Sequence, residues 1–311
     1  MESGSGITIF ADEERNMLII KMNGGLGNQL QQYALYEKLK SLGKDVKLDI
    51  SWFGKDYGKA LKRDLELDYF PGADYETCSA SELKQVGERS FFRKILEKIH
   101  LVDSKLYVEH QMYDEKIFQM DNKVLEGYWA CEAYYEDILP GLRKKLVFPK
   151  SDNPKNQKME KIMRSCNAVS LHLRRGDYLT PGNQEMFGGI CTDEYYEQAI
   201  SYMKEKVRNP RFFVFSDDPA YAKEKYQGEE YTIVDINHGR DSFLDVYLMS
   251  CCKHHICANS TFSFWGARLN PNNDKIMVRP LKQKNCDWYV PKEMKQLWKK
   301  WVLIDEKGKV W

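Results

Sequence analysis

The strongest constraint on the fold is the order strand, glycine turn, helix, strand near the start of the chain. Leu18–Met22 is a short apolar run that ends at a Gly-Gly pair, which predicts a buried strand entering a tight turn. Apolar residues recur at helical spacing over Gln29–Leu42, and Gly43 is placed to end that helix. Val46–Ile50 then alternates apolar and polar residues, which predicts a second strand. This series is typical of a parallel sheet, so we expect an α/β protein.

A second series of strands and helices follows Phe148–Lys158, a segment rich in Pro, Asn and Lys that we interpret as a linker. Between the two series, Ser51–Leu146 is expected to be α/β with insertions, including a helical pattern at Phe91–His100. The second series comprises strands at Val169–Leu173, Phe212–Phe215, Thr232–Ile236, His255–Ala258 and Ile276–Val278, and helices at Asp193–Lys206 (capped by Thr192), Ser242–Ser250 and Ser260–Leu269. We therefore predict an extension at residues 1–16, either disordered or left over from cloning, a domain at 17–150 and a domain at 151–311.

Composition excludes several classes of protein. The 47 basic and 46 acidic residues nearly cancel, so charge gives no reason to expect a nucleic-acid or anionic-membrane partner. No apolar run approaches the ~20 residues that a membrane span needs. The eight cysteines form no CxxC pair and the chain shows no secretion signal, so we expect reduced, mostly buried thiols in a cytoplasmic protein.

Four segments carry the residues suited to chemistry, and each lies at a predicted strand-to-helix junction, where open α/β sheets bind ligands. The first is Asn23–Gln29 (NGGLGNQ), whose glycines let the backbone approach a ligand and whose helix N-terminus favours an anion. Leu30 replaces the third glycine of a dinucleotide-binding motif, and no Gly-Lys-Ser/Thr follows. A purely structural turn is the alternative.

The second segment is His172–Asp177 (HLRRGD). At a strand end, the Arg174 guanidinium is placed to grip a phosphate through two parallel hydrogen bonds. Gly176 permits the turn, and Asp177 is placed to brace one of the two arginines. The alternative is a surface arginine pair beside a solvated acid.

The third segment is Ser216–Pro219, where Asp217 and Asp218 either contact a ribose, base or metal, or cap the helix that begins near Pro219. Adjacent carboxylates point in different directions, so the indication of a metal is weak. The fourth combines Asp245 with Asn259–Gly266, whose hydroxyls and free N–H groups suit a diphosphate. For Asp245 the alternative is a solvated acid in mid-helix.

Together these segments resemble the alpha-1,2-fucosyltransferases, particularly the soluble bacterial ones. The matching segments are GGLGNQLQQYAL (Gly24–Leu35), GYWACEAYY (Gly127–Tyr135), HLRRGDY (His172–Tyr178), DEYYEQAI (Asp193–Ile200), FFVFSDD (Phe212–Asp218) and NSTFSFWGA (Asn259–Ala267). They occur in the family's order from Met17 onward. The chain departs from its bacterial relatives at Gln31, where Phe is frequent, and at Ala130-Cys131, where Gln-Ser is frequent; both differences bear on acceptor preference.

The resemblance implies a GT-B architecture, in which two Rossmann-like domains face each other across a cleft. The C-terminal domain would hold GDP-L-fucose, and the N-terminal domain would mostly shape the acceptor site. The implied reaction moves fucose, with inversion, from GDP-β-L-fucose to the 2-hydroxyl of a terminal β-galactoside on a glycan. No metal or other cofactor is expected, because a cationic side chain and helix N–H groups suffice to stabilise departing GDP.

The resemblance also assigns roles to single residues. Arg174 would bind the β-phosphate with support from His172, and Asp177 completes the implied catalytic set. Asp245 would read guanine, since a carboxylate accepts from N1–H and N2–H together. A general base is not identified; Asp177, Asp218 and His172 are the candidates. The implied substrate-binding positions are Gly25, Gly27, Asn28, Gln29, Asp218, Asp245, Asn259, Ser260, Thr261, Phe262 and Ser263.

Three other functions stay open at this point. One is a GDP-sugar transferase that forms a different linkage. Another is a non-catalytic module that binds a sugar or nucleotide, which the 19 Tyr and 7 Trp would suit. An NAD-dependent dehydrogenase is disfavoured by the missing third glycine and because Asp49 is the only acid near the end of the second strand.

Overall fold

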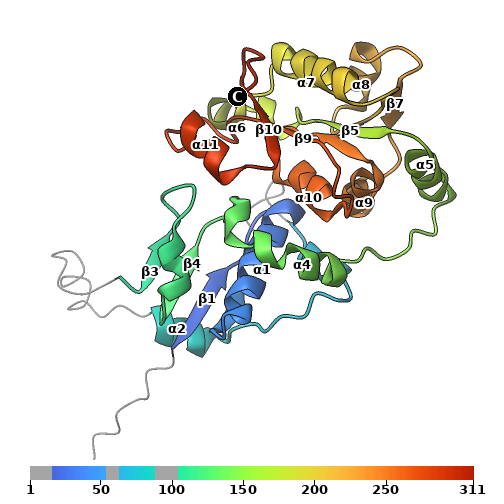
Figure 1. Ribbon diagram of the computed structural model, residues 1–311. Coiled ribbons are helices and arrows are strands. Elements are labelled where there is room, and N and C mark those ends of the chain that lie inside the picture. Colours follow the sequence, from blue (N-terminus) through green and yellow to red (C-terminus); the bar gives the residue numbers. More distant parts are fainter. Residues whose placement is uncertain (1–15, 54–62, 88–103) are drawn as a thin grey trace, which may run out of the picture.

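The computed structural model describes residues 16–53, 63–87 and 104–311, and in these ranges the strands form two sheets in which all pairs are parallel (Figure 1). The expected α/β fold with parallel sheets is therefore confirmed. The predicted extension, apart from its last residue, and the helical pattern at Phe91–His100 lie outside the described residues. The division into domains at 17–150 and 151–311 stays a prediction.

The first sheet has the strand order β2-β1-β4-β3. Its strands are β1 (Met17–Lys21), β2 (Asp45–Asp49), β3 (Leu106–Val108) and β4 (Lys123–Glu126), and the helices on this side are α1 (Leu26–Ser41), α2 (Ala80–Gly87) and α4 (Leu139–Lys145). Strand β1 is apolar on both faces because it lies between two other strands with side chains packed above and below it. Gly43 adopts φ 77° just after α1, which confirms it as the residue that ends this helix.

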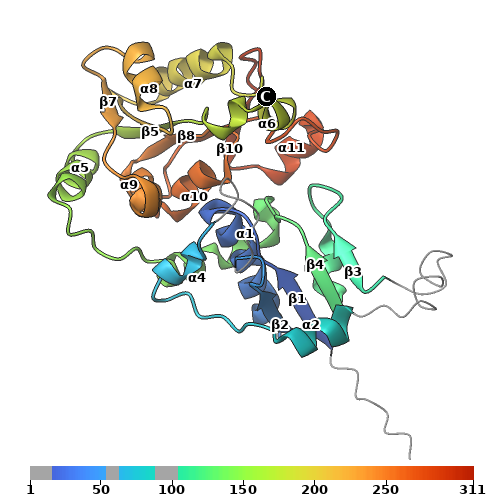
Figure 2. The same cartoon turned by 180° about the vertical axis from the view of Figure 1, so that it is seen from behind.

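The second sheet has the order β10-β9-β8-β5-β6-β7. Its strands are β5 (Ala168–Leu173), β6 (Arg211–Ser216), β7 (Tyr231–Val234), β8 (His254–Ile256), β9 (Met277–Pro280) and β10 (Trp301–Ile304). Its helices are α5 (Pro154–Ser165), α6 (Pro181–Phe187), α7 (Asp193–Lys206), α8 (Pro219–Lys225), α9 (Phe243–Cys251), α10 (Thr261–Leu269) and α11 (Pro291–Leu297). Helices α7 and α8 bury apolar residues on one face of the sheet, whereas α5 and α9 cover the other (Figure 2).

Most expected elements of the second series are present, and Thr192 caps α7 as predicted, because its side chain accepts a hydrogen bond from the Tyr195 N–H. The linker prediction is wrong in its second half. Helix α5 begins at Pro154, since the Asn153 side chain caps it and a proline suits the first helical turn. The connection between α4 and α5 is therefore limited to residues 146–153. All eight cysteines are free thiols.

One buried apolar cluster includes residues from both sheets. Helix α10 follows β8 of the second sheet, yet Phe264 and Trp265 belong to the same buried cluster as Leu30 and Tyr33 of α1, and both views show α10 against α1 (Figures 1 and 2). At the end of α10, buried Arg268 forms a 3.0 Å ion pair with Glu132 from the other side. None of the helices in the described ranges is long and apolar enough to cross a lipid bilayer.

Candidate active site

The glycine turn before α1 meets the start of α10. The Thr261 hydroxyl donates a 3.0 Å hydrogen bond to Oδ1 of Asn28, although the two residues lie 233 positions apart. A Cβ placed on Gly27 would lie 2.6 Å from the Phe262 backbone nitrogen, so glycine is needed for the close approach of the two helices. The first and fourth segments singled out in the sequence are thus brought together, and Gly27 and Asn28 serve that contact.

Arg174 lies directly after β5 and is held by two carboxylates. One of its terminal nitrogens is 2.7 Å from Asp177 and the other is 3.1 Å from Asp217. The neighbouring Arg175 turns elsewhere, because its guanidinium stacks 3.6 Å from the centre of the Tyr221 ring. The prediction that Asp177 braces an arginine is confirmed for Arg174, and Asp217 is a second brace that the sequence did not indicate.

Asp218 follows the capping alternative. One carboxylate oxygen accepts from the Tyr221 N–H at 3.1 Å and caps α8, and the other lies 3.3 Å from Nε of Arg175. Both oxygens of Asp218 are therefore engaged within the protein, which favours the capping role over a contact with the substrate. Gly176 is required at its position because an added Cβ would lie 2.6 Å from a carboxylate oxygen of Asp217.

His172 is buried beneath this arginine, with its ring 5.9 Å from the Phe262 ring and its Nδ1 atom without a hydrogen-bond partner. Burial, with the charge of Arg174, lowers the pKa of His172 to about 3. The imidazole is therefore neutral at physiological pH. A base of that strength is poorly matched to proton transfer near pH 7, so His172 is disfavoured as a general base.

At the start of α10, side chains serve the protein and backbone groups remain for a ligand. Ser263 donates to the Ser260 carbonyl at 3.2 Å, and the buried amide of Asn259 donates to the Phe187 and Gln283 carbonyls, each at 3.1 Å. No side chain caps the helix. The side chains of Asn259, Thr261 and Ser263 therefore have protein partners, and their binding of a diphosphate stays a prediction. The N–H groups of the first turn of α10 have no side-chain cap and are suited to an anion.

The start of α1 differs, because a carboxylate already occupies it. Glu66, in the short 3-10 helix Glu66–Tyr69, accepts a 2.9 Å hydrogen bond from the Leu26 N–H, and burial raises the pKa of this acid. The buried amide of Gln29 bonds to the backbone of residues 24, 64 and 67, so we assign Gln29 to the support of the turn rather than to the substrate. Gly25 has open space around it and is the part of the turn free to face a ligand.

Asp245 is held by a buried amide network. The Asn237 amide donates a 2.7 Å hydrogen bond to one oxygen of Asp245, and Asn237 exchanges hydrogen bonds of 2.7 and 3.1 Å with Asn156. Burial, with the charge of Asp235, raises the pKa of Asp245 to about 7. The solvated-acid alternative is therefore wrong, and one oxygen of Asp245 remains available to a donor.

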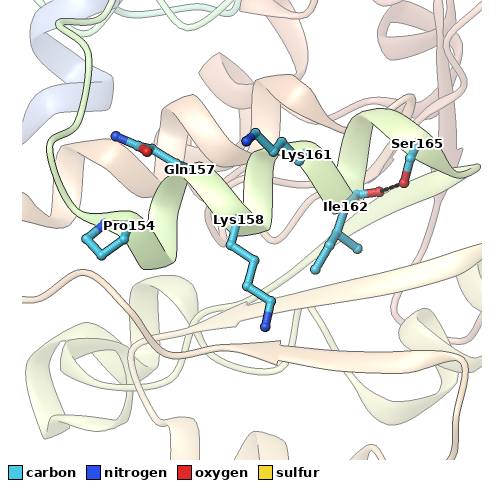
Figure 3. Close-up of a pocket in the computed structure, with 6 residues that line it drawn as sticks. All are labelled: Pro154, Gln157, Lys158, Lys161, Ile162 and Ser165. Atoms are coloured by element: carbon cyan, nitrogen blue, oxygen red, sulfur yellow. Dashed lines mark hydrogen bonds between the residues drawn. The ribbon is translucent and has the colours of Figure 1, made fainter.

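Surface depressions elsewhere lack this convergence. One of about 490 Å³ runs along α5 and is lined by Lys158 and Lys161, which point away from each other (Figure 3). Another, of about 640 Å³, lies around Lys253 and Asn272. Among the described residues, no group of three or more His, Cys, Asp or Glu side chains is arranged to hold a metal ion.

Parallel sheets, an arginine at a strand tip and a helix N-terminus without a side-chain cap together are suited to a sugar-nucleotide-dependent glycosyltransferase. The family model described as glycosyl transferase family 11 matches residues 78–305. The chain belongs to this family, and family membership supports glycosyltransferase activity.

Individual relatives agree with this membership. The alpha-1,2-colitosyltransferase of Escherichia coli is 31% identical over 302 residues, which cover 94% of this chain and all of the relative. Galactoside alpha-(1,2)-fucosyltransferase 2 of Sus scrofa is 29% identical over 108 residues, 34% of this chain and 32% of the relative. Among solved structures, the fucosyltransferase NodZ from Bradyrhizobium superposes with a TM-score of 0.46 at 15% identity, over 83% of this chain and 94% of that one.

Proposed function

We propose that the chain is an inverting galactoside alpha-1,2-fucosyltransferase with GDP-β-L-fucose as donor. The observation that carries the proposal is Arg174, fixed at the tip of β5 by Asp177 and Asp217 beside the segment that leads into α10. The Tyr178 hydroxyl bonds to the Asn259 carbonyl at 3.1 Å, which ties the arginine turn to that segment. A fixed cation and free N–H groups at one place suit the diphosphate of a sugar nucleotide.

In this proposal Asp245 accepts from guanine with the oxygen that Asn237 leaves free, and Arg174 binds the β-phosphate. The 2-hydroxyl oxygen of the acceptor forms a bond to C1 of fucose as the bond from C1 to the phosphate oxygen breaks. GDP leaves with the electron pair, and its charge is stabilised by Arg174 and the α10 N–H groups. A single displacement inverts the β-linked donor into an α-linked product.

The hydroxyl proton needs a base, and we assign it to Asp177. Asp218 is engaged by Arg175 and by α8, and His172 is buried with its pKa lowered to about 3. Asp177 is bound to Arg174 through one oxygen, Oδ1, whereas both oxygens of Asp218 are engaged, so Asp177 has an oxygen left for the hydroxyl proton. When phosphate takes the place of a carboxylate on Arg174, Asp177 is released to accept a proton.

The test is GDP release from GDP-fucose with and without a panel of β-galactosides, followed by assignment of the product linkage by NMR. Release that depends on lactose, with a new α-1,2 linkage, supports the proposal. Release from UDP- or CMP-sugars instead, or binding without release, contradicts it.

We further propose that transfer needs neither a metal nor another cofactor and takes place in the cytoplasm. Arg174 and the α10 N-terminus supply the charge stabilisation that a divalent cation supplies elsewhere. Turnover should be unchanged after dialysis against EDTA. Activity that disappears in EDTA and returns with Mg²⁺ or Mn²⁺ contradicts this.

A second candidate donor is GDP-colitose, which the similarity to the E. coli colitosyltransferase favours. Colitose is L-fucose without its 3-hydroxyl. A site that hydrogen-bonds the 3-hydroxyl rejects the deoxy sugar strongly, because its own polar groups are then left unpaired. Comparing kcat/KM for the two donors with one acceptor decides between them.

A further inference from the structure

The segment that follows β4 is held in an unusual backbone conformation. Trp129 adopts φ 54°, in the left-handed region that bulky side chains rarely enter. Such a conformation persists only where surrounding contacts impose it, and such strain concentrates at functional sites. Nothing in the proposed donor chemistry uses this segment.

The imposed contact comes from Glu109, directly after β3. Its two carboxylate oxygens accept from the Tyr128 N–H at 2.8 Å and from the Trp129 N–H at 3.2 Å. A Cβ on Gly127 would lie 2.5 Å from the Cβ of Glu109, so a glycine is required for the carboxylate to sit under the turn. Burial raises the pKa of Glu109, and Lys284 from the second-sheet side acts on it in the opposite direction. Arg268 of α10 also donates a 2.9 Å hydrogen bond to the carbonyl of Ala130, the residue after Trp129, so this segment contacts the second-sheet side.

In this turn the ring of Trp129 is buried in the protein, whereas the ring of the preceding Tyr128 is exposed to solvent. Trp129 is fully buried and stacks on Tyr107 with ring centres 6.1 Å apart. Tyr128 is 46% exposed, which places it among the exposed large hydrophobic side chains of the described residues. The Gln32 amide donates to the Gly127 carbonyl at 3.0 Å and its oxygen accepts from the Asn23 N–H at 3.1 Å, which fixes this turn beside the glycine turn.

We propose that Tyr128 is the platform on which the terminal pyranose ring of the acceptor stacks, and that Glu109 is the residue that positions it. The proposal rests on the proposed function, since it supplies the acceptor site of that reaction. A galactoside presents an apolar face of C–H groups, which packs on the face of an aromatic ring. Because a rigid two-torsion side chain on a clamped backbone has little freedom left to lose, such a platform binds its ligand at low entropic cost.

The experiment measures KM for lactose and for GDP-fucose in Tyr128→Ala, Tyr128→Phe and Glu109→Gln. We expect Tyr128→Ala to raise the lactose KM about tenfold, which corresponds to about 1.4 kcal/mol of binding energy. Tyr128→Phe should keep the wild-type value, because the ring face is retained. Glu109→Gln should raise the lactose KM with little change in the GDP-fucose KM, since an amide keeps one acceptor where the turn needs two. Tyr202→Ala, on α7, is the control and should change neither.

Lactose binding in the presence of GDP, followed by saturation-transfer NMR, separates this proposal from the proposed function. A wild-type enzyme that transfers fucose while Tyr128→Ala keeps its lactose KM overturns the platform alone. If the wild-type protein transfers no sugar but binds lactose, and Tyr128→Ala loses the lactose signal, the proposed function is overturned and the platform is supported. If Glu109→Gln raises both KM values equally and lowers the melting temperature, Glu109 has only a structural role, and the proposal that it positions Tyr128 is overturned. Absence of any lactose signal in the wild type overturns both.

Discussion

Helices α1 and α10 both start at the carboxyl ends of parallel strands and contact each other at their N-termini. The two N-termini differ in the groups that they can bind. The start of α1 already holds a negative charge, because the Glu66 carboxylate accepts from the Leu26 N–H. The start of α10 has no side-chain cap, and the turn that carries Arg174 is tied to it through Tyr178 and Asn259. A carboxylate repels a second anion, whereas free N–H groups and a guanidinium attract one. In the proposed function the diphosphate therefore binds at α10, and α1 provides the opposing wall.

The largest effect that this comparison predicts is on turnover. Arg174→Ala should lower kcat for GDP release by about 10²–10³-fold, because the charge of departing GDP loses its main partner. Arg175→Ala is the matched control, since that guanidinium is engaged by Asp218 and Tyr221, and it should lose less than about tenfold. Near wild-type turnover in Arg174→Ala would show that the anion site lies elsewhere.

The next effect is on nucleotide affinity. Asp245→Asn should weaken GDP binding by about tenfold or more, as expected for a lost hydrogen-bonding charge. The pKa of Asp245 is about 7, so wild-type affinity should fall as the pH is lowered through that value and the carboxylate becomes protonated. Titration calorimetry at several pH values measures both. Asp235→Asn should move the midpoint of the pH dependence to lower pH, because the charge of Asp235 contributes to the raised pKa of Asp245. A pH-dependence that is the same in Asp245→Asn and in the wild type would contradict the assignment.

A stability effect tests the contact between the two helices. Gly27→Ala should lower the free energy of unfolding by about 1–3 kcal/mol, because the added Cβ would lie 2.4 Å from Oγ1 of Thr261. Gly25→Ala, two residues earlier, has open space and should change it by less than about 0.5 kcal/mol. Urea unfolding of the pair measures the difference. Equal stabilities would mean that α1 and α10 are not in close contact in solution.

The smallest predicted effect concerns the charge at α1. Glu66→Gln should change the free energy of unfolding by less than about 0.5 kcal/mol, because the weaker interaction of a neutral acceptor with the helix N-terminus is opposed by the lower cost of burying a neutral group. GDP affinity should stay within about twofold of the wild type. A large loss of GDP affinity would place the diphosphate at α1 as well and remove the distinction between the two helices.

Local sequence signals were sufficient to predict most strands and helices of the second sheet and the first strand, helix and second strand of the first sheet. The helix at Asp193–Lys206 was predicted with its observed bounds, because Thr192 is a strong cap and apolar spacing is regular. Strands β3 and β4 were not predicted, since they span only Leu106–Val108 and Lys123–Glu126 and are too short to show a clear alternation. Their neighbours, rather than their own patterns, define them as strands.

The sequence predicted which segments meet at the candidate site, but not which side chains support the protein backbone there. The glycine turn, the arginine turn and the start of α10 meet, as their positions at strand ends suggested. The roles of Gln29 and Asn259 could not be foreseen, because their amides bond to backbone groups as far as 38 and 72 residues away. Glu66 and Glu109 gave no signal for the same reason: each meets its partners through the tertiary fold alone.

The shared core around α10 has a consequence for how this protein comes apart. Separating the two sheets would break the buried ion pair between the Arg268 guanidinium and the Glu132 carboxylate. A buried charge without its partner is strongly destabilising. On heating, the parts of the chain around the two sheets should therefore unfold together in one calorimetric peak, with no intermediate in which only one sheet is folded.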